Sequence, residues 1–365
     1  MKTDAGERWL PSDVEAVEVA QRLLHDGMAM TPIARALWGK SVSAAAGIGR
    51  VLRLLEYAYE RGIVQIEPPR RADLASDLAA RFTNVEFAVI NDAHYRDHEL
   101  WLRALHAAAA ERTAAHLEAA FARKAESGSS VVIGNAGGPS VWGAVQALAR
   151  LAGRRDPARF GKLLSLSLNA AAIPENYYAS ANVAAVHLAE MHRGRHLAVS
   201  LPWPERIAAE YEEQLNNLDI VLCAAGAATG LLFGWFRKHY PLIAIPPGAV
   251  GDLCLIPLLP NGQEAEIDPK SEYCNRLLPQ PGYDRLARIA HEGGKQVIVV
   301  LSTPAPESWS LEVVSKSLPA HLSKLAIARA ILARGLANTM IIGSRMAEAL
   351  LGRDSDVPAS DAPVH

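Results

Sequence analysis

Apolar and polar positions follow two recurring patterns along most of the chain. Short apolar runs predict buried strands, and stretches with apolar positions three and four apart predict helices. Strands are expected over 85–90, 130–134, 163–168, 196–201, 219–224, 242–245, 296–301 and 338–342. Helices are expected between them over 74–82, 100–125, 141–151, 182–191 and 323–334. This alternation predicts an α/β fold with a mostly parallel, doubly wound sheet covered by helices on both faces.

The first 67 residues show helical periodicity instead of this alternation. Ser12 is a candidate helix N-cap, with Glu15 three residues later as its capping-box partner. An apolar stripe follows at helical spacing and includes Val14, Val17 and Leu24. Two further helices and a short strand are expected over 31–37, 48–60 and 63–66. Three helices followed by a small β wing predict a winged helix-turn-helix.

Charge is unevenly distributed along the chain. The net charge of −2 excludes the whole molecule as a nonspecific nucleic-acid binder. Between residues 35 and 71, however, seven Lys and Arg residues stand against three acids, a local excess of four positive charges. This excess coincides with the helix-turn-helix pattern and therefore favours a polyanion as the partner of that segment.

Cysteine spacing and the apolar segments narrow the class of protein further. Cys223, Cys254 and Cys274 show no CxxC spacing, so we expect buried thiols in a reducing cytosol rather than disulfides or a zinc site. The first ten residues carry charges with no apolar core behind them, so a signal peptide is not expected. Residues 220–236 are uncharged but contain three glycines, which favours a strand, a turn and a helix over a membrane span. A cytoplasmic protein is expected.

The first candidate site is a glycine-rich turn between an expected strand and an expected helix, with the sequence Gly134-Asn135-Ala136-Gly137-Gly138-Pro139-Ser140. Such a turn directs backbone N–H groups and a helix N-terminus toward an anion. The Ser140 hydroxyl can donate to the same anion. No Walker lysine and no GxGxxG spacing are present, so nucleoside triphosphates and dinucleotides are not favoured. The alternative is a tight turn that binds nothing.

Two further charged residues stand where ligands gather in α/β proteins. Asp252 ends the segment Gly248-Ala249-Val250-Gly251-Asp252 after an expected strand, and it can accept hydrogen bonds from sugar hydroxyls or simply cap a turn. Lys324 stands at the start of an expected helix, where a cation opposes the helix dipole unless an anion lies nearby. A solvated surface lysine is the alternative. His94 and His98 are four apart but lack a third ligand, so no metal site is expected.

Together these segments resemble the SorC-type, DeoR-like sugar-binding transcriptional regulators over about residues 31–350. The glycine-rich turn is similar to the family's phosphate-cradling loop, and Asp252 to its acidic sugar contact. Lys324, fourteen residues before Asn338, resembles the phosphate-contacting lysine. Leu168-Asn169 and Ser180-Ala181-Asn182 resemble two further ligand-facing segments. Effector contacts are therefore expected from Gly134, Asn135, Gly137, Gly138, Ser140, Asn169, Asn182, Gly226, Asp252 and Lys324.

The resemblance implies a regulator and not an enzyme, without a cofactor. A winged helix-turn-helix DNA-binding domain is expected over 1–67, a linker over 68–73, a sugar-phosphate isomerase-like effector and oligomerisation domain over 74–352, and a disordered tail over 353–365. The implied partners are a double-stranded DNA operator and a sugar, sugar phosphate or polyol effector, in a homodimer or homotetramer. The DNA contacts are expected from Lys40, Ser41, Ser43, Arg50 and Arg53.

The chain departs from the family pattern at two places. The stretch from Trp38 to Ala46 exceeds the family's tight turn by about two helical turns' worth of residues. Gly47-Ile48-Gly49 then replaces a polar helix start, so DNA recognition is altered, lost or supplied by the turn. Residues 318–323 stand where the family has a Gly-Gly turn. This departure implies either a narrower effector pocket or an unusual polyol as the effector. A sugar-phosphate enzyme, which would need an acid–base pair, and a ligand sensor without DNA binding therefore stay as alternatives.

Overall fold

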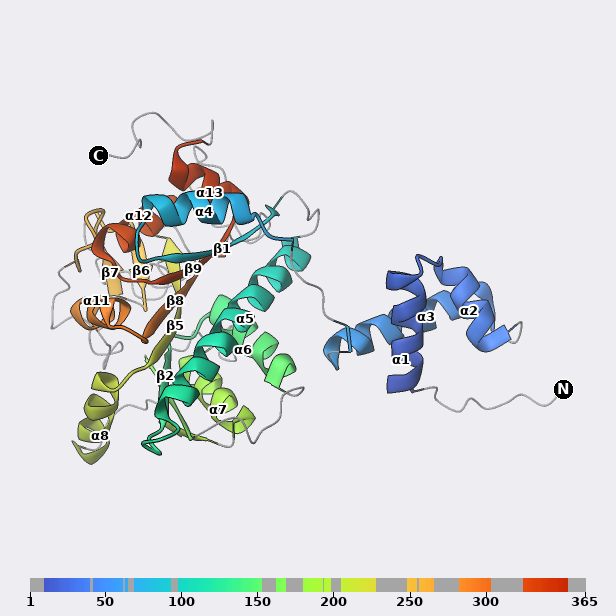
Figure 1. Cartoon of the computed structure of the whole chain (residues 1–365), viewed down its shortest axis with the longest axis horizontal. Helices are drawn as coiled ribbons and strands as arrows, with labels where there is room; N and C mark the ends of the chain where they lie inside the picture. Colours follow the sequence, from blue (N-terminus) through green and yellow to red (C-terminus); the bar gives the residue numbers. More distant parts are fainter. Residues whose placement is uncertain are drawn as a thin grey trace, which may run out of the picture. The chain divides into compact units, whose positions relative to one another are not determined.

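The computed structural model describes residues 10–39, 42–61, 63–64, 69–92, 98–152, 162–168, 180–192, 194–197, 205–227, 248–254, 256–265, 282–302 and 324–353. The chain divides into two units, Met1–Glu67 and Pro68–His365, which we call the head and the body. Figure 1 shows the helices and strands of both units. The head has one cluster of buried apolar residues and the body has two.

The body is built on a parallel sheet. In spatial order its described strands are β1 (Glu86–Ile90), β9 (Thr339–Gly343), β8 (Gln296–Val300), β5 (Ile220–Ala227), β2 (Val131–Asn135), β3 (Leu163–Ser167) and β4 (Arg195–Leu197). Each neighbouring pair in this order is parallel. The short strands β6 (Gly251–Leu253) and β7 (Ile256–Leu258) form an antiparallel hairpin that pairs with the end of β5.

Helices cover both faces of this sheet, as the alternating sequence pattern predicted (Figure 1). One face packs against α5 (His98–Lys124), α6 (Pro139–Ala152) and α7 (Ala181–Met191). The other packs against α4 (Ala72–Arg81), α8 (Glu205–Asn216), α11 (Tyr283–His291), α12 (Leu325–Arg334) and α13 (Ser344–Leu351). Within β8, Ile298 and Val300 join the first core while Val297 and Val299 join the second. Strands buried on both faces account for the continuous apolar runs of the sequence.

Strand order creates a switch point at the centre of the sheet. After β2 the chain continues to β3 and β4 on one side, and after β5 it continues to β8 and β9 on the other. β2 and β5 are hydrogen-bonded neighbours, with Asn135 opposite Leu222. The direction in which the chain adds strands to the sheet therefore reverses between β2 and β5. Open α/β sheets bind ligands in the crevice at such a point.

At the opposite, amino edge of the sheet, where the parallel strands begin, polar side chains are hydrogen-bonded to one another and to the backbone. Asp219 is 5% exposed and accepts hydrogen bonds from the Lys124 ammonium (2.5 Å) and the Val132 N–H (2.7 Å). Asn338 accepts from the Val297 N–H (2.8 Å) and donates to the Ala290 carbonyl of α11 (3.0 Å) and to the Lys295 carbonyl before β8 (2.8 Å). Asn338, which forms part of the resemblance to the family, therefore has a structural role in this fold.

Residues 69–71, expected as part of a linker, lie along the end of β1. The Arg71 N–H donates to the Val89 carbonyl (2.9 Å), and the Asn91 N–H donates to the Pro69 carbonyl (2.9 Å). α4 begins directly afterwards at Ala72. These backbone bonds make residues 69–71 an ordered part of the body.

The described part of the head contains three α-helices that pack around a shared core. Its helical elements are α1 (Asp13–Ala20), the π-helical turn η1 (Gln21–His25), α2 (Met30–Trp38) and α3 (Ala44–Glu60). Its buried core contains Ala16, Val19, Ile33, Val51 and Leu54.

The start of α3 corrects the sequence prediction. We predicted a helix from residue 48, but α3 begins at Ala44, because the Ser43 side chain caps it by accepting a hydrogen bond from the Ala46 N–H (3.3 Å). The three alanines that follow are strong helix formers. Gly47, predicted to replace the helix start, lies inside α3, where a Cβ would come within 2.7 Å of the Ala34 Cβ. The predicted extra turn is therefore the first turn of α3, and only residues 39–43 connect it to α2.

The orientation of α1 differs from the predicted apolar stripe. Val14 is 78% exposed and Val17 is 48% exposed, whereas Ala16 and Val19 are buried. Two hydrogen bonds accompany this orientation. Asp13 accepts from the Tyr57 hydroxyl (2.7 Å), and the Trp38 indole N–H donates to the Glu15 carboxylate. The face of α1 with Ala16, Val19 and Ala20 is therefore buried, and Val14 and Val17 face outward.

The described part of the predicted wing is not a strand. The N–H groups of Ile63 and Val64 both donate to the Ala58 carbonyl (2.7 and 3.1 Å), which closes the end of α3. Several other predicted features lie outside the described residues: Lys40, Ser41, residues 65–66, His94, Asn169, the strand over 242–245, Cys274 and the tail beyond Arg353.

The described ranges can be searched for a membrane-spanning helix and for a metal site. Within them, no helix has the length and apolar character needed to cross a bilayer, and no three His, Cys, Asp or Glu side chains gather as metal ligands would. Cys223 and Cys254 are buried free thiols, as the sequence predicted.

Candidate functional site

The glycine-rich turn lies at the carboxyl edge, directly between β2 and α6. Gly137 and Gly138 have φ values of 68° and 90°, in the left-handed region that glycine adopts without strain. Pro139 then opens α6, and its missing N–H costs nothing at a first helical position. The Ala136 N–H is held by the Leu222 carbonyl (3.1 Å), which ties the turn to β5. The N-terminus of a fourteen-residue helix therefore faces the crevice at the switch point.

Strand alternation directs polar side chains from several strands onto one face. Asn135 follows Ile133 by two residues, and Ser302 follows Val300 by two, so each pair shares a face of the sheet. Ile133, Ile298 and Val300 belong to the core under α5, α6 and α7. Asp252 is paired directly opposite Gly226 in the antiparallel β5–β6 ladder, so their side-chain positions share a face. The intervening Ala225 and Leu253 belong to the opposite core. Asn135, Asp252 and Ser302 therefore reach the carboxyl edge on the side covered by α6.

Asn135 is the buried polar residue of this edge. It is 0% exposed, and its amide nitrogen donates to the Leu166 carbonyl of β3 (3.1 Å). Its amide oxygen is buried and finds no hydrogen-bond partner within the described residues. A buried acceptor left open costs about 1–3 kcal/mol. This oxygen is therefore suited to accept a hydrogen bond from a ligand hydroxyl.

Asp252 and Lys324 are electrostatically coupled beside the switch point. Asp252 is 4% exposed, and Gly226 leaves room for it, because a Cβ there would lie 2.2 Å from the carboxylate oxygen. Lys324 is the half-buried N-cap residue of α12. Burial lowers the pKa of Lys324 to about 8, and the Asp252 carboxylate opposes that shift. A cation held at a helix start in low-polarity surroundings gains from a bound anion.

Ser140 forms a side-chain bond that no sequence pattern indicated. Its hydroxyl lies 2.6 Å from the hydroxyl of Ser302, just beyond β8. Ser140 is 7% exposed and Ser302 is half-buried. Ser302 is the site residue that sequence analysis missed.

Asn182 is the remaining predicted effector contact in the described part of the body. Asn182 lies in the first turn of α7, whose N-cap Ser180 accepts from the Val183 N–H (3.3 Å). α7 follows β3 in chain order and packs as a whole against β2, β3 and α6. Trp142, near the glycine-rich turn, packs against His187 of α7 with ring centroids 5.5 Å apart. Effector contact by any of these residues stays a prediction.

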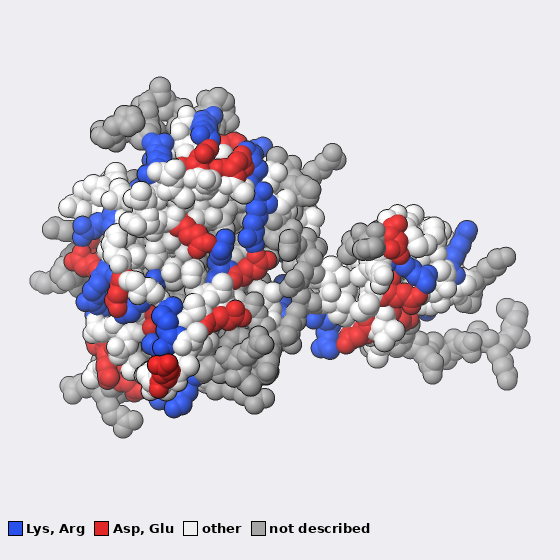
Figure 2. All heavy atoms as spheres, in the orientation of Figure 1, with Lys and Arg blue, Asp and Glu red and all other residues white. Residues whose placement is uncertain are grey.

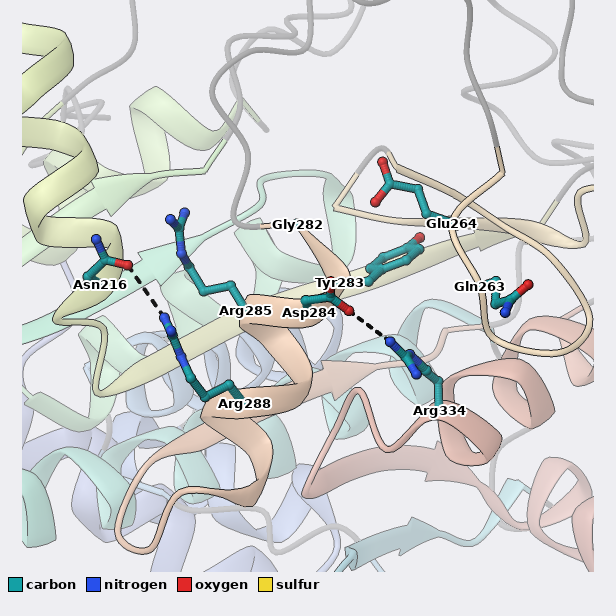
Figure 3. A pocket seen from close by; sticks show the side chains of 9 residues that line it. All are labelled: Asn216, Gln263, Glu264, Gly282, Tyr283, Asp284, Arg285, Arg288 and Arg334. Carbon is teal, nitrogen blue, oxygen red and sulfur yellow. Dashed lines mark hydrogen bonds and ion pairs between the residues drawn. The ribbon is translucent and has the colours of Figure 1, made fainter.

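A separate cavity of about 690 Å³ lies beside α11 (Figure 3). It is lined by Asn216, Gln263, Glu264, Gly282, Tyr283, Asp284, Arg285, Arg288 and Arg334. Its arginines are already engaged in the pairs Arg285–Glu212 (3.1 Å), Arg288–Asn216 (3.4 Å) and Arg334–Asp284 (2.7 Å). None of the predicted effector residues lines this cavity.

On the head, the predicted DNA contacts that can be located lie on α3. Arg53 and the cap residue Ser43 are exposed. Arg50 is half-buried, with its guanidinium 5.6 Å from the centre of the Trp38 ring, so part of its role is packing. The exposed first turn of α3 consists of alanines, Ala44–Ala46. Acidic and basic side chains are interspersed on the faces visible in Figure 2.

Comparison with known proteins identifies the fold. No protein-family model matches the sequence, and no curated protein matches it either. The full-length sorbitol operon regulator SorC from Klebsiella pneumoniae superposes with a TM-score of 0.57 at 16% identity, covering 94% of this chain and 100% of that chain. This chain has the SorC fold.

Two further solved structures agree. A DeoR family transcriptional regulator from Listeria monocytogenes has a TM-score of 0.54 at 16% identity and covers 76% of this chain and 98% of its own. A transcriptional regulator from Streptococcus pneumoniae has a TM-score of 0.52 at 11% identity and covers 77% of this chain and 96% of its own. The predicted resemblance to SorC and DeoR-type regulators is confirmed at the level of the fold.

Proposed function

We propose that this chain is a DNA-binding transcriptional regulator whose operator affinity is controlled by a sugar, sugar phosphate or polyol. The observation that carries the proposal is that β2 and β5, neighbours at the switch point, bring Asn135 with the start of α6, and Asp252 with its coupled Lys324, to the same edge of the sheet. The fold of the solved regulators supports it.

The chemistry of this edge favours a ligand with both hydroxyls and electronegative oxygens. The Asp252 carboxylate and the open Asn135 oxygen accept hydrogen bonds and therefore suit sugar hydroxyls. The turn of α6 and the Lys324 ammonium supply positive potential and therefore suit a phosphate or another oxygen-rich group. A polyhydroxylated molecule, phosphorylated or not, satisfies both halves.

The head supplies the proposed DNA contact. Only residues 39–43 separate α2 from α3, so the two helices form a helix-turn-helix, with α3 as the recognition helix. Arg53 and Ser43 are exposed on it, and Lys40 and Ser41 belong to the connecting turn. We propose residues 1–67 as the DNA-binding domain and residues 74–352 as the effector and oligomerisation domain of a cytoplasmic homodimer or homotetramer.

Fluorescence anisotropy on labelled DNA tests the proposal. The purified protein is titrated into DNA from its own upstream region and into scrambled DNA, at two salt concentrations. Tighter binding to the upstream DNA, weakening as salt rises, is expected because phosphate contacts release counterions. Equal binding to both DNAs would contradict sequence-specific regulation. Turnover of a sugar phosphate that Asp252→Asn abolishes would instead favour an enzyme.

A further inference from the structure

We infer that Ser302 is a positioning residue of the effector site, whose hydroxyl orients the Ser140 hydroxyl toward an oxyanion at the start of α6. The inference rests on the proposed function, because it concerns the same site. It adds a residue from β8 to a site otherwise built from β2, the β5–β6 ladder and the start of α12.

The position of the hydroxyl pair within the sheet supports this role. β8 and β2 are not neighbours, since β5 lies between them. The 2.6 Å contact between Ser302 and Ser140 therefore passes across β5, the strand that borders the switch point. Both hydroxyls reach the carboxyl edge on the face that also carries Asn135 and Asp252.

The backbone around Ser302 is fixed. The N–H of the preceding residue, Leu301, donates to the Ile341 carbonyl of β9 (2.9 Å), and the Leu301 side chain is buried on the opposite face. Ser302 is thus held by the sheet. Ser140 lies in the first turn of α6, and the following residue, Val141, is fully buried and holds that turn against the core. Two anchored hydroxyls define one geometry for an incoming ligand.

One hydroxyl proton of the Ser140–Ser302 pair is available to a ligand. Two serine hydroxyls carry two protons, and only one proton can lie between oxygens that bond to each other. When Ser302 donates to Ser140, the Ser140 proton is free to point toward the N-terminus of α6, where an anion is favoured. The Ser302 bond also polarises the Ser140 hydroxyl, which strengthens its donation to the ligand.

A double-mutant cycle tests this role with defined probes. Binding of inorganic phosphate, glucose 6-phosphate and glucose is measured by calorimetry on the full-length protein and on Ser302→Ala, Ser302→Thr, Ser140→Ala and the double alanine variant. We expect Ser302→Ala to weaken binding about fivefold, the effect of one hydrogen bond. Ser302→Thr keeps the hydroxyl and should bind as the natural protein does. In the Ser140→Ala background, Ser302→Ala should have no further effect.

Each outcome decides between distinct alternatives. An effect of Ser302→Ala that is equal with and without the Ser140 hydroxyl, or no effect at all, would overturn the inference and leave the proposed function standing. Binding of glucose but of neither phosphate probe would overturn the oxyanion role of the pair. If the natural protein binds neither phosphate probe nor glucose, the inference fails, and the proposed function loses its support when a wider polyol panel also fails. Melting temperatures of all variants separate binding losses from unfolding.

Discussion

The two edges of the body's sheet contain similar polar residues but treat them differently. At the amino edge, Lys124 and Asp219 are 2.5 Å apart, and each makes a further bond to the backbone. At the carboxyl edge, Lys324 and Asp252 are electrostatically coupled, yet burial lowers the pKa of the lysine. Near them, the buried Asn135 oxygen finds no partner within the described residues.

This difference separates structural from functional polar groups. Buried polar groups in folded proteins are nearly always hydrogen-bonded, so a saturated group is explained by folding alone. An open buried acceptor and a cation with a shifted pKa are costs to stability, and such costs concentrate where a ligand compensates them. We therefore expect mutations at the amino edge to change stability, and mutations at the carboxyl edge to change binding.

The largest expected effect is on stability, from Asp219→Ala. Removing the Asp219 carboxylate leaves the buried Val132 N–H without its acceptor and the partly exposed Lys124 ammonium without its partner, which costs about 3 kcal/mol in the free energy of unfolding. Urea denaturation followed by circular dichroism measures this. Asp284→Ala is the control, because its carboxylate is 91% exposed in its pair with Arg334; its cost should stay below about 1 kcal/mol. Equal costs for the two variants would remove the contrast between the edges.

The next effect is on binding, from Lys324→Met. Loss of a charge-assisted hydrogen bond should weaken binding of glucose 6-phosphate by about 10- to 100-fold. Stability should not fall, because a cation in unfavourable surroundings is removed. Calorimetry and thermal melting measure the two quantities. Lys295→Met is the control, since its ammonium pairs with Glu292 on the turn before β8 (2.8 Å). Unchanged affinity in Lys324→Met would show that the effector lies elsewhere.

A smaller effect is expected from Gly226→Ala. Its Cβ would lie 2.2 Å from a carboxylate oxygen of Asp252, so that carboxylate must move. Overpacking of this kind costs about 1–3 kcal/mol, and we expect it as weaker binding of both glucose and glucose 6-phosphate. Gly293→Ala is the matched control, because its Cβ would meet nothing within 4 Å. Full affinity in Gly226→Ala would exclude the Asp252 carboxylate as a sugar contact.

The smallest effect is a pH dependence. Protonated Lys324 attracts anions, and its pKa of about 8 means that the charge is lost as pH rises through that value. Binding of sulfate, which does not titrate here, should therefore weaken roughly fourfold between about pH 7 and pH 8.5 if only the protonated lysine binds. The same titration on Lys324→Met should be flat. A matching decline in that variant would assign the titration to another group.

The sequence indicated candidate residues for this site but not their arrangement. The glycine-rich turn was indicated by its local pattern, whereas the roles of Asp252 and Lys324 came from the resemblance to the regulator family, and their contact with an effector stays a prediction. The pairing of Asp252 with Gly226 depends on β6, a strand of three residues that is too short to show periodicity. Ser302 was missed because its role depends on a bond to a residue 162 positions away. Long-range contacts of this kind leave no mark on local sequence.

In the head, the errors have local causes. The capping serine Ser43 and the alanines after it were readable signals, and weighing them above Gly47 would have placed the start of α3 correctly. Val14 and Val17 fit a helical stripe, but the hydrogen bond from Tyr57 to Asp13 turns α1 so that they face outward. Periodicity predicts which faces a helix has, and tertiary bonds decide which of them is buried.

Hydrogen–deuterium exchange with and without a bound sugar phosphate tests most directly the claim that the carboxyl edge holds the effector. Glucose 6-phosphate, or the member of a sugar-phosphate and polyol panel that raises the melting temperature most, serves as the ligand. We predict slower exchange over residues 134–142 and 324–328, with no change around Lys124, Asp219 and Asn338 at the amino edge. Protection at the amino edge, or beside α11 with none at the glycine-rich turn, would contradict the account.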